Sequence, residues 1–370
     1  GFPIAMIIGG LLYNQVGPKR MMYAAFFCHL LGLVLTITAG GFVGLLVSTF
    51  FIGFANGCVE AACNPLIADM YHDNKTTMLN KFHVWFPGGI VIGSLVAFAM
   101  EGINWQYQIA VMIVPTIIYG YFVFTSKFPK IEHIENDTSE NIKGLFNPLF
   151  WFIMICMTLT ATSEFGTTQW VDRILGKAGA EPMLILALVT GVMAAGRYFA
   201  GGLVHRLNPS GVLWASAIIT TIGIYLLSIS TGGLVYVAAF LFAIGICYFW
   251  PTMIGFTAEN IPKTGALGMS LVGGAGMFAM TIWNPVIGQW LDQNRMAELG
   301  VSGESGLIEL EKFREALAAG DAQSDAIELA AGQATLGNLA IFPAILIILF
   351  GGLYFYMRSR KQSNTVTNLK

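Results

Sequence analysis

Long apolar runs separated by short polar turns dominate the chain. A membrane-spanning helix needs about 20 apolar residues, and runs of this kind predict eleven spans, at 2–15, 20–40, 42–67, 79–100, 106–126, 147–171, 181–204, 210–230, 233–257, 265–290 and 335–357. The apolar residues are continuous along each run and do not alternate with polar ones, which favours helices over closed strands. The pattern therefore predicts an all-α integral membrane protein.

Two long connections, 127–146 and 291–334, interrupt this pattern. The first separates five predicted spans from six. Because apolar helix begins at once after Gly1, with no methionine or leader before it, we expect one helix to be missing ahead of the first span. Adding it gives two six-helix halves, the layout of a transporter built of two repeats. We predict an N-terminal half at 1–126, a cytoplasmic linker at 127–146, a C-terminal half at 147–357 and a cytoplasmic tail at 358–370.

The placement of basic residues orients these spans. With the 16–20 turn on the cytoplasmic side, most lysines and arginines fall in cytoplasmic loops, as expected from the positive-inside rule. The insert 291–334 then lies outside. Its 304–331 portion has Leu310, Phe313 and Leu317 at helical spacing, which predicts one or two surface helices. A solvated amphipathic face is the simpler interpretation, and a lid over the substrate route is the alternative.

Composition supports a membrane protein and excludes several functions. The chain is 55% hydrophobic and 11% charged, against about 25% charged residues in soluble domains. No basic patch is interleaved with aromatics, so nucleic acid is not an expected partner. The five cysteines all lie in apolar segments, which favours packing over disulfides. Without paired histidines or a phosphate-binding loop, we expect no metal, no cofactor, no enzyme activity and no ATP-driven pumping.

Glu60 and Asn64 are the most informative polar pair within a span. They are four residues apart and directly precede Pro65, so on a helix they share one face. A carboxylate in an apolar helix costs roughly 2.5–3.5 kcal/mol on insertion scales, a cost carried mainly where the group lines a cavity or a proton route. Glu60 is therefore a candidate proton-binding and substrate-binding residue, with a structural carboxylate as the alternative.

A second acid, Glu164, lies in a polar run from 160 to 170. Thr168 shares its helix face, and Gln169 and Trp170 follow. Hydroxyl, amide, carboxylate and indole groups fit a sugar, which has hydroxyls on its rim and an apolar ring face. The alternative is a polar contact between helices.

Further candidates stand beside proline breaks or within spans. His83 could be a proton relay, a sugar ligand or a packing histidine. Trp250 and Asn284 each lie next to a proline, where a broken helix can offer polar groups to a ligand. Arg197, near a span end, is expected to pair with another helix or with headgroups. Asp69, Asp73 and Lys75 are loop charges with a gating or solubilising role.

The first cytoplasmic turn carries a loop motif made of Gly10, Asn14, Gly17, Lys19 and Arg20. It resembles the loop signature of the major facilitator superfamily, although Asn14 stands where that family usually has an aspartate. A partial echo lies at 196–209, beginning with Gly196-Arg197. The resemblance implies the major facilitator fold, with these residues in gating.

The stretch around Glu60 narrows the resemblance. Glu60-Ala-Ala-Cys-Asn64-Pro65, followed by His83 and then Phe86-Pro87-Gly88-Gly89, resembles the fucose permease-like sugar:proton symporters. In that family the matching acid is implicated in sugar binding and proton coupling. The resemblance implies a multi-pass transporter of the bacterial inner membrane that imports a hexose or deoxyhexose with protons by alternating access.

Other functions remain open at this point. Within the same class, the chain could be a facilitator or a sodium-coupled carrier of another small polar solute. A membrane receptor that binds sugar without moving it belongs to a different class. We expect a sugar and the lipid bilayer as the partners of a monomer.

Overall fold

The computed structural model describes residues 1–129, 137–175 and 181–367, and this part of the chain is helical throughout, without strands. Nine of its helices are long and apolar enough to cross a membrane, and two shorter apolar helices cover Phe2–Val16 and Pro182–Tyr198. The predicted all-α class is confirmed. The count of eleven spans stays a prediction, as do the domain boundaries, and part of the predicted linker lies outside the described residues.

The chain forms two compact units that do not follow the two predicted halves. Unit 1 holds Gly1–Phe82, Leu95–Thr158 and Trp250–Phe278, and unit 2 holds His83–Ser94, Leu159–Phe249 and Ala279–Lys370. The helices are α1 Phe2–Val16, α2 Pro18–Ile37, α3 Phe42–Met70, α4 Lys75–Phe82, α5 Trp85–Ala99, α6 Trp105–Ala110, α7 Ile113–Thr125, α8 Thr138–Gly144, α9 Pro148–Ala161, α10 Thr167–Leu175, α11 Pro182–Tyr198, α12 Ala200–Leu227, α13 Leu234–Ile246, α14 Phe249–Asn260, α15 Gly265–Glu298, α16 Gly303–Ala318, α17 Ala322–Leu339 and α18 Ile341–Thr367.

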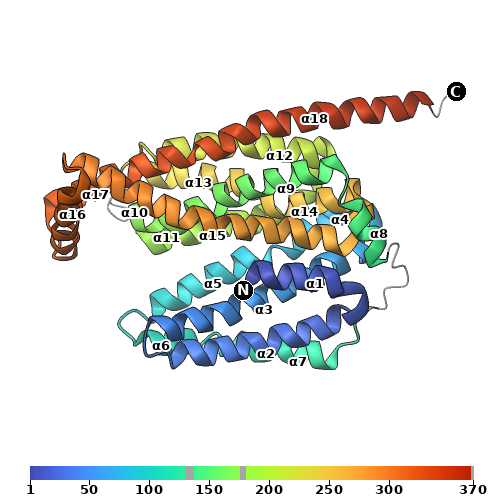
Figure 1. The fold of residues 1–370 in the computed structure, drawn as a ribbon, viewed down its shortest axis with the longest axis horizontal. Coiled ribbons are helices and arrows are strands. Elements are labelled where there is room, and N and C mark those ends of the chain that lie inside the picture. The colour runs from blue at the N-terminus through green and yellow to red at the C-terminus, as the bar shows by residue number, and fades with distance from the viewer. Residues whose placement is uncertain (130–136, 176–180, 368–370) are drawn as a thin grey trace. The chain divides into compact units, whose positions relative to one another are not determined.

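Small residues set the packing of unit 1, where α3 lies against α1 and α2 (Figure 1). A Cβ atom at Gly57 would lie 2.5 Å from the carbonyl oxygen of Phe2, and one at Gly9 would lie 2.6 Å from the Cβ of Ala61. Glycine at these positions lets the backbones approach closely, which is how helices associate where no water drives them together.

Unit 2 uses the same device between α12 and α13. A Cβ at Gly223 would lie 2.6 Å from the Cα of Phe242, and one at Gly245 would lie 2.5 Å from the backbone nitrogen of Thr220. The helix α18 runs along α12 (Figure 1), where Trp214 and Tyr354 stack with ring centroids 5.5 Å apart.

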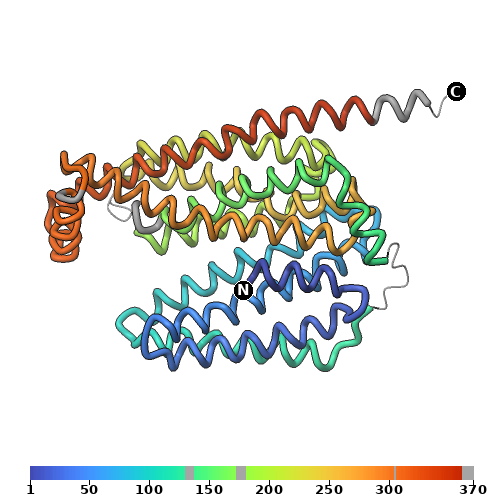
Figure 2. The backbone as a smooth tube through the Cα atoms, viewed as in Figure 1, coloured from blue at the N-terminus to red at the C-terminus, as the bar shows by residue number. Residues whose placement is uncertain are grey.

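The predicted surface insert forms the two helices α16 and α17, and Figure 2 shows the chain turning back between them. Asp321 caps α17 by accepting a hydrogen bond from the backbone N–H of Ser324. The hydrogen bonds from Ser324 hold the pKa of Asp321 below its ordinary value. The helix α17 packs against α10 and α12 and buries Glu328, so part of its surface is covered. The lid over the substrate route stays a prediction.

Candidate functional site

The predicted pair on α3 meets a third predicted residue in unit 1. Asn64 Nδ2 donates to Glu60 Oε2 over 2.7 Å, and Trp250 Nε1 donates to the same oxygen over 3.3 Å. The spacing of four residues accounts for the contact with Asn64. Trp250 lies at the start of α14, 190 residues away in sequence.

The two contacts of Glu60 define the role of its Oε2. An indole N–H can only donate, so Oε2 must accept. Asn64 is buried, and its Oδ1 has no hydrogen-bond partner among the described residues. Buried polar atoms without a partner are uncommon, so this oxygen is an acceptor available to a hydroxyl group beside Glu60.

Trp250 also lies in an apolar setting. It is 5% exposed, and its ring packs edge-on against Phe2 with centroids 6.3 Å apart. A Cβ at Gly273 would come 3.4 Å from the Trp250 ring, so glycine on α15 makes room for the indole. The sequence pointed to Trp250 through its neighbouring proline, but it did not indicate Glu60 as the partner.

The second predicted acid, Glu164, lies in unit 2 on a turn of π-helix. This turn, η2, covers Thr162–Gly166 and joins α9 to α10. A π-helical turn is rare and is frequently found at functional sites. Glu164 is 2% exposed, and the polar run from 160 to 170 gave no sign of the changed helix type.

Arg197 lies beside Glu164, and a partner on another helix was one of the two partners that the sequence analysis expected for it; its place in the gating motif stays a prediction. Its Nη2 donates to Glu164 Oε1 over 3.1 Å, while Nη1 donates to the carbonyl oxygen of His83 and Nε to that of Cys247. Arg197 is 1% exposed. The guanidinium thus joins four separate segments of unit 2, using the fixed fork of donors that distinguishes arginine from lysine.

One oxygen of this carboxylate remains available. Glu164 Oε2 and the nearby Thr167 Oγ1 have no hydrogen-bond partner among the described residues, and both side chains are buried. A buried ion pair costs desolvation energy that its own attraction only partly repays. The arrangement therefore suits a site in which Arg197 binds one oxygen of Glu164 while Oε2 accepts a hydrogen bond from a ligand.

The other predicted residues of unit 2 have different surroundings. Thr168 donates its hydroxyl to the carbonyl oxygen of Glu164, and Gln169 is exposed. Asn284 Oδ1 and Trp170 Nε1 are both without a partner in the described part of the chain. A Cβ at Gly288, one turn after Asn284, would lie 3.8 Å from the Trp170 ring. Trp170 and Asn284 thus come from neighbouring parts of α10 and α15. The His83 side chain is buried.

The loop motif takes up defined positions in unit 1. Gly17 has φ of 78°, ending α1 and beginning α2, a backbone conformation that favours glycine. Lys19 donates to the carbonyl oxygen of Ser126 at the end of α7 over 2.9 Å, so it caps a neighbouring helix. Arg20 is exposed. The gating role of Gly10, Asn14, Gly17, Lys19 and Arg20 stays a prediction.

A polar cluster that sequence reasoning missed links α2, α3 and α7. His29 Nδ1 lies 2.7 Å from the Tyr119 hydroxyl, and His29 Nε2 lies 2.8 Å from Asn56 Oδ1. Asn56 precedes Glu60 by one helical turn, so the two share a face of α3. Polar residues within apolar spans were the available signal, but only Glu60 and Asn64 came with a recognisable motif.

Comparisons with known proteins agree with the fold. The family model of the Major Facilitator Superfamily matches residues 1–294. A curated relative from Xenopus tropicalis, solute carrier family 2, facilitated glucose transporter member 10, is 27% identical over 148 residues. That match covers 38% of this chain, and the chain spans only about a quarter, 26%, of the relative's length.

Several solved structures share the fold at low sequence identity. The transporter FucP in its outward conformation matches with a TM-score of 0.63 and 17% identity, covering 93% of this chain and 87% of that chain. The proton:xylose symporter XylE matches with a TM-score of 0.61 and 13% identity, covering 93% and 84%. The human organic anion transporter MFSD10 matches with a TM-score of 0.64 and 12% identity, covering 94% and 80%. With a family match over most of its length and this multi-helix fold, the chain belongs to the Major Facilitator Superfamily.

Proposed function

We propose that this chain imports a sugar of hexose or deoxyhexose type across a bacterial inner membrane, coupled to protons, by alternating access. The observation that carries the proposal is the contact of Glu60 with Asn64 and Trp250. These side chains bring a carboxylate, an amide and an indole together within unit 1. Sugar binding uses hydrogen bonds to ring hydroxyls and apolar contact with the ring face, and this set of groups offers both.

Glu60 is the proposed coupling residue because protonation changes its hydrogen bonding. Ionised, the carboxylate accepts from both donors through Oε2. When the carboxyl group is protonated, it becomes a donor itself, and its bonds to Asn64 and Trp250 lose the added strength of a charged acceptor. A transporter can use this difference to favour one conformation over the other, because any ligand shifts an equilibrium only through its differential affinity for the two states.

Glu164 is not the proposed binding site for the coupling ion, because Arg197 Nη2 lies 3.1 Å from Glu164 Oε1. A fixed positive charge at this distance disfavours a sodium ion and a proton on this carboxylate alike, so the coupling proton is proposed to bind at Glu60. Among the described residues, no cluster of three or more His, Cys, Asp or Glu side chains could hold a metal ion. The names of the structural neighbours, a proton:xylose symporter and a fucose:proton symporter, add support by analogy.

The test is uptake of radiolabelled L-fucose, D-galactose and D-glucose into proteoliposomes, with and without an inward proton gradient. We expect at least one sugar to accumulate under the gradient. Glu60→Gln should abolish accumulation but keep sugar counterflow, because Gln keeps the acceptor oxygen and cannot take up a proton. Glu101→Gln, which changes an exposed acid, is the matched control and should behave as the native protein.

Other outcomes separate the alternatives. Uptake that equilibrates regardless of either gradient indicates a facilitator, and uptake that follows an inward sodium gradient indicates a sodium-coupled carrier. Sugar binding without uptake indicates a receptor. If Glu60→Gln accumulates sugar as the native protein does, Glu60 is structural and the coupling proposal is wrong.

A further inference from the structure

The end of α14 contacts the start of α4 within unit 1, although the two are far apart in sequence. The backbone N–H of Thr76 donates to Glu259 Oε1 over 2.9 Å. Thr76 is the second residue of α4, and the first N–H groups of a helix have no partner within it. A carboxylate at this position satisfies one of them and interacts favourably with the helix dipole.

Two more contacts reinforce this one along a single stripe of α14. A Cβ at Gly255 would lie 2.5 Å from Thr76 Oγ1 and 2.7 Å from its Cα. Asn80 Nδ2, one turn along α4, lies 3.3 Å from Thr252 Oγ1. Residues 252, 255 and 259 are spaced by three and four, so they share one face of α14. The contact is therefore an extended seam between two helices, which we name the α4–α14 seam.

The α4–α14 seam contains buried polar atoms that have no hydrogen-bond partner when the two helices are in contact. Thr76 Oγ1 and Asn80 Oδ1 are buried and make no hydrogen bond within the described part of the chain. A permanent interface normally satisfies such atoms, because each one left buried forfeits its hydrogen bonds to water. Opening the seam would hydrate both atoms, which offsets the loss of the Glu259 cap. We therefore expect the free energies of the closed and the open seam to differ only slightly.

The segments that precede α4 and α15 repeat one pattern. Asp69 lies six residues before the start of α4, with the three-residue turn His72–Asn74 between them. Glu259 lies six residues before the start of α15, with the turn Pro262–Thr264 between them. The sequence analysis assigned Asp69 a gating or solubilising role at its turn. Glu259 takes the equivalent position in the second predicted half.

A second close contact lies between α1 and α15 in the same unit. A Cβ at Gly10 would lie 2.6 Å from the Cβ of Ser270 and 3.2 Å from the Cα of Leu267. Ser270 is 1% exposed, and its hydroxyl also lacks a partner among the described residues. Gly10 belongs to the loop motif at the predicted cytoplasmic turn, so both contacts belong to the predicted cytoplasmic end of their helices.

We propose that Glu259 is a positioning residue for transport, which closes the predicted cytoplasmic end by capping α4 across the α4–α14 seam. Release of its carboxylate from Thr76 opens the seam and admits water to α4, α14 and the start of α15. The inference deepens the proposed transport by alternating access and rests on it. It does not depend on which sugar or ion is carried.

The test measures how readily the seam opens. In Ser270→Cys, a thiol replaces a buried hydroxyl that makes no hydrogen bond. Inside-out membrane vesicles are treated with a membrane-impermeant maleimide, and mass spectrometry gives the labelling rate at position 270. We expect Glu259→Ala to raise this rate about threefold to tenfold, the range implied by the loss of a charged helix cap. Glu259→Gln keeps an acceptor and should give a smaller increase.

Controls separate opening from general loosening. Cys156, which is fully buried on α9, is the internal reference and should stay unlabelled. Glu140→Ala removes an exposed acid of α8 and should leave the rate at 270 unchanged. Gly255→Ala inserts a methyl group against Thr76 and should raise the rate without touching Glu259.

Two results overturn the proposal. One is an equal labelling rate at position 270 in Ser270→Cys and in Ser270→Cys combined with Glu259→Ala. The other is a parallel rise at Cys156, which would make the effect a loss of structure. Because the readout needs neither sugar nor a proton gradient, a failure of sugar uptake and a failure of this inference are seen separately. If Gly255→Ala does not fold, the Glu259 variants still decide.

Discussion

At the scale of single residues, Arg197 holds several segments of unit 2 together. Arg197→Ala would leave the buried carboxyl group of Glu164 without its partner, together with the carbonyl oxygens of His83 and Cys247. Removing one partner of a buried ion pair typically costs about 3–5 kcal/mol. We expect a lower thermal unfolding temperature in detergent, measured by intrinsic tryptophan fluorescence, and little recovery in Arg197→Lys, which lacks the planar fork of donors.

A double variant separates stability from transport at this pair. Arg197→Met combined with Glu164→Leu removes both charges and fills the space with apolar side chains, a change that is often neutral for stability. We expect it to unfold near the native temperature and to lose sugar binding. Normal sugar binding by this variant would show that the pair only holds helices together.

At the scale of residues, the sequence predicted which residues belong to the candidate site better than it predicted which residues they contact. Glu60 and Asn64 were predicted as a pair because four-residue spacing on a helix is a local property. Trp250 and Arg197 were noted individually, but their partners come from distant segments. Such contacts depend on how helices pack, which no local pattern encodes. Glu259 was not singled out, since an acid at the end of an apolar helix looks like any loop charge.

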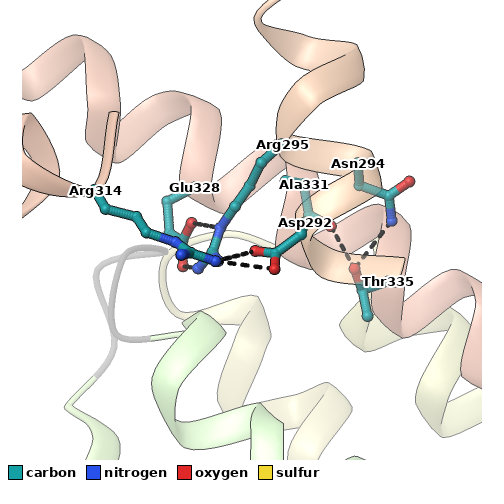
Figure 3. Close-up of polar contacts among 7 residues, drawn as sticks. All are labelled: Asp292, Asn294, Arg295, Arg314, Glu328, Ala331 and Thr335. Carbon is teal, nitrogen blue, oxygen red and sulfur yellow. Dashed lines mark hydrogen bonds and ion pairs between the residues drawn. The ribbon is translucent and has the colours of Figure 1, made fainter. Parts of the chain in front are cut away.

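At the scale of helices, the end of α15 is fastened to the insert by charge. Arg295 donates from Nε and Nη2 to the two oxygens of Glu328 on α17 over 2.6 and 2.5 Å, and from Nη1 to Asp292 (Figure 3). Arg295 is 4% exposed and Glu328 is 2% exposed. This is the paired, two-point geometry that makes an arginine–carboxylate contact strong.

The same network offers its own comparison. Arg314 on α16 also binds Asp292, but its side chain is half exposed. We expect Glu328→Gln to lower the unfolding temperature clearly, because it removes the charge that meets Arg295 at two points and leaves Asp292 as the remaining acidic partner. Breaking a buried pair costs about 3–5 kcal/mol, and the contact with Asp292 reduces that cost. Arg314→Gln should change it little, since exposed pairs contribute about 0–1 kcal/mol. Equal losses in the two variants would contradict this reading of burial.

The existence of these helices was predictable from Leu310, Phe313 and Leu317, but their attachment was not. The pattern favoured a solvated face, and α16 does keep charged residues in water. Glu328 is buried, although a charged residue in this sequence context predicts a solvent-exposed position. Its burial depends on the contact with Arg295, which lies on another helix.

At the scale of the whole molecule, the proposed orientation predicts which lysines face each side of the membrane. Lys75 begins α4 and Lys263 lies in the turn Pro262–Thr264, and the proposed orientation puts both on the cytoplasmic side. Lys312 lies on α16, which it puts outside. Lys312 is well exposed, at 64%. In intact spheroplasts, an impermeant amine reagent should modify Lys312 and spare the other two, with the pattern reversed in inside-out vesicles. Labelling of Lys75 in intact spheroplasts would invert the topology.

The predicted fold class was accessible because it depends on properties that repeat along the chain, whereas the family was identified from its resemblance at the first cytoplasmic turn and around Glu60. Apolar runs of membrane length and the distribution of lysine and arginine recur many times, so errors in one segment do not change the result. The composition of the compact units could not be predicted from the sequence. Unit 1 includes Trp250–Phe278, and no local sequence pattern in such apolar helices indicates which other helices they pack against.

The π-helical turn at Thr162–Gly166 also sets the rotational phase of the helix that follows it. An α-helix advances about 100° per residue, and a π-turn accommodates one additional residue in a turn. Thr167 and Trp170 therefore face directions that a helical wheel drawn through the whole span would assign to their neighbours. Deleting a single residue within the turn would restore a continuous wheel and swing both side chains to another face. A one-residue difference in length, with every chemical group kept, would thus be enough to give a related transporter a different set of polar groups in this unit.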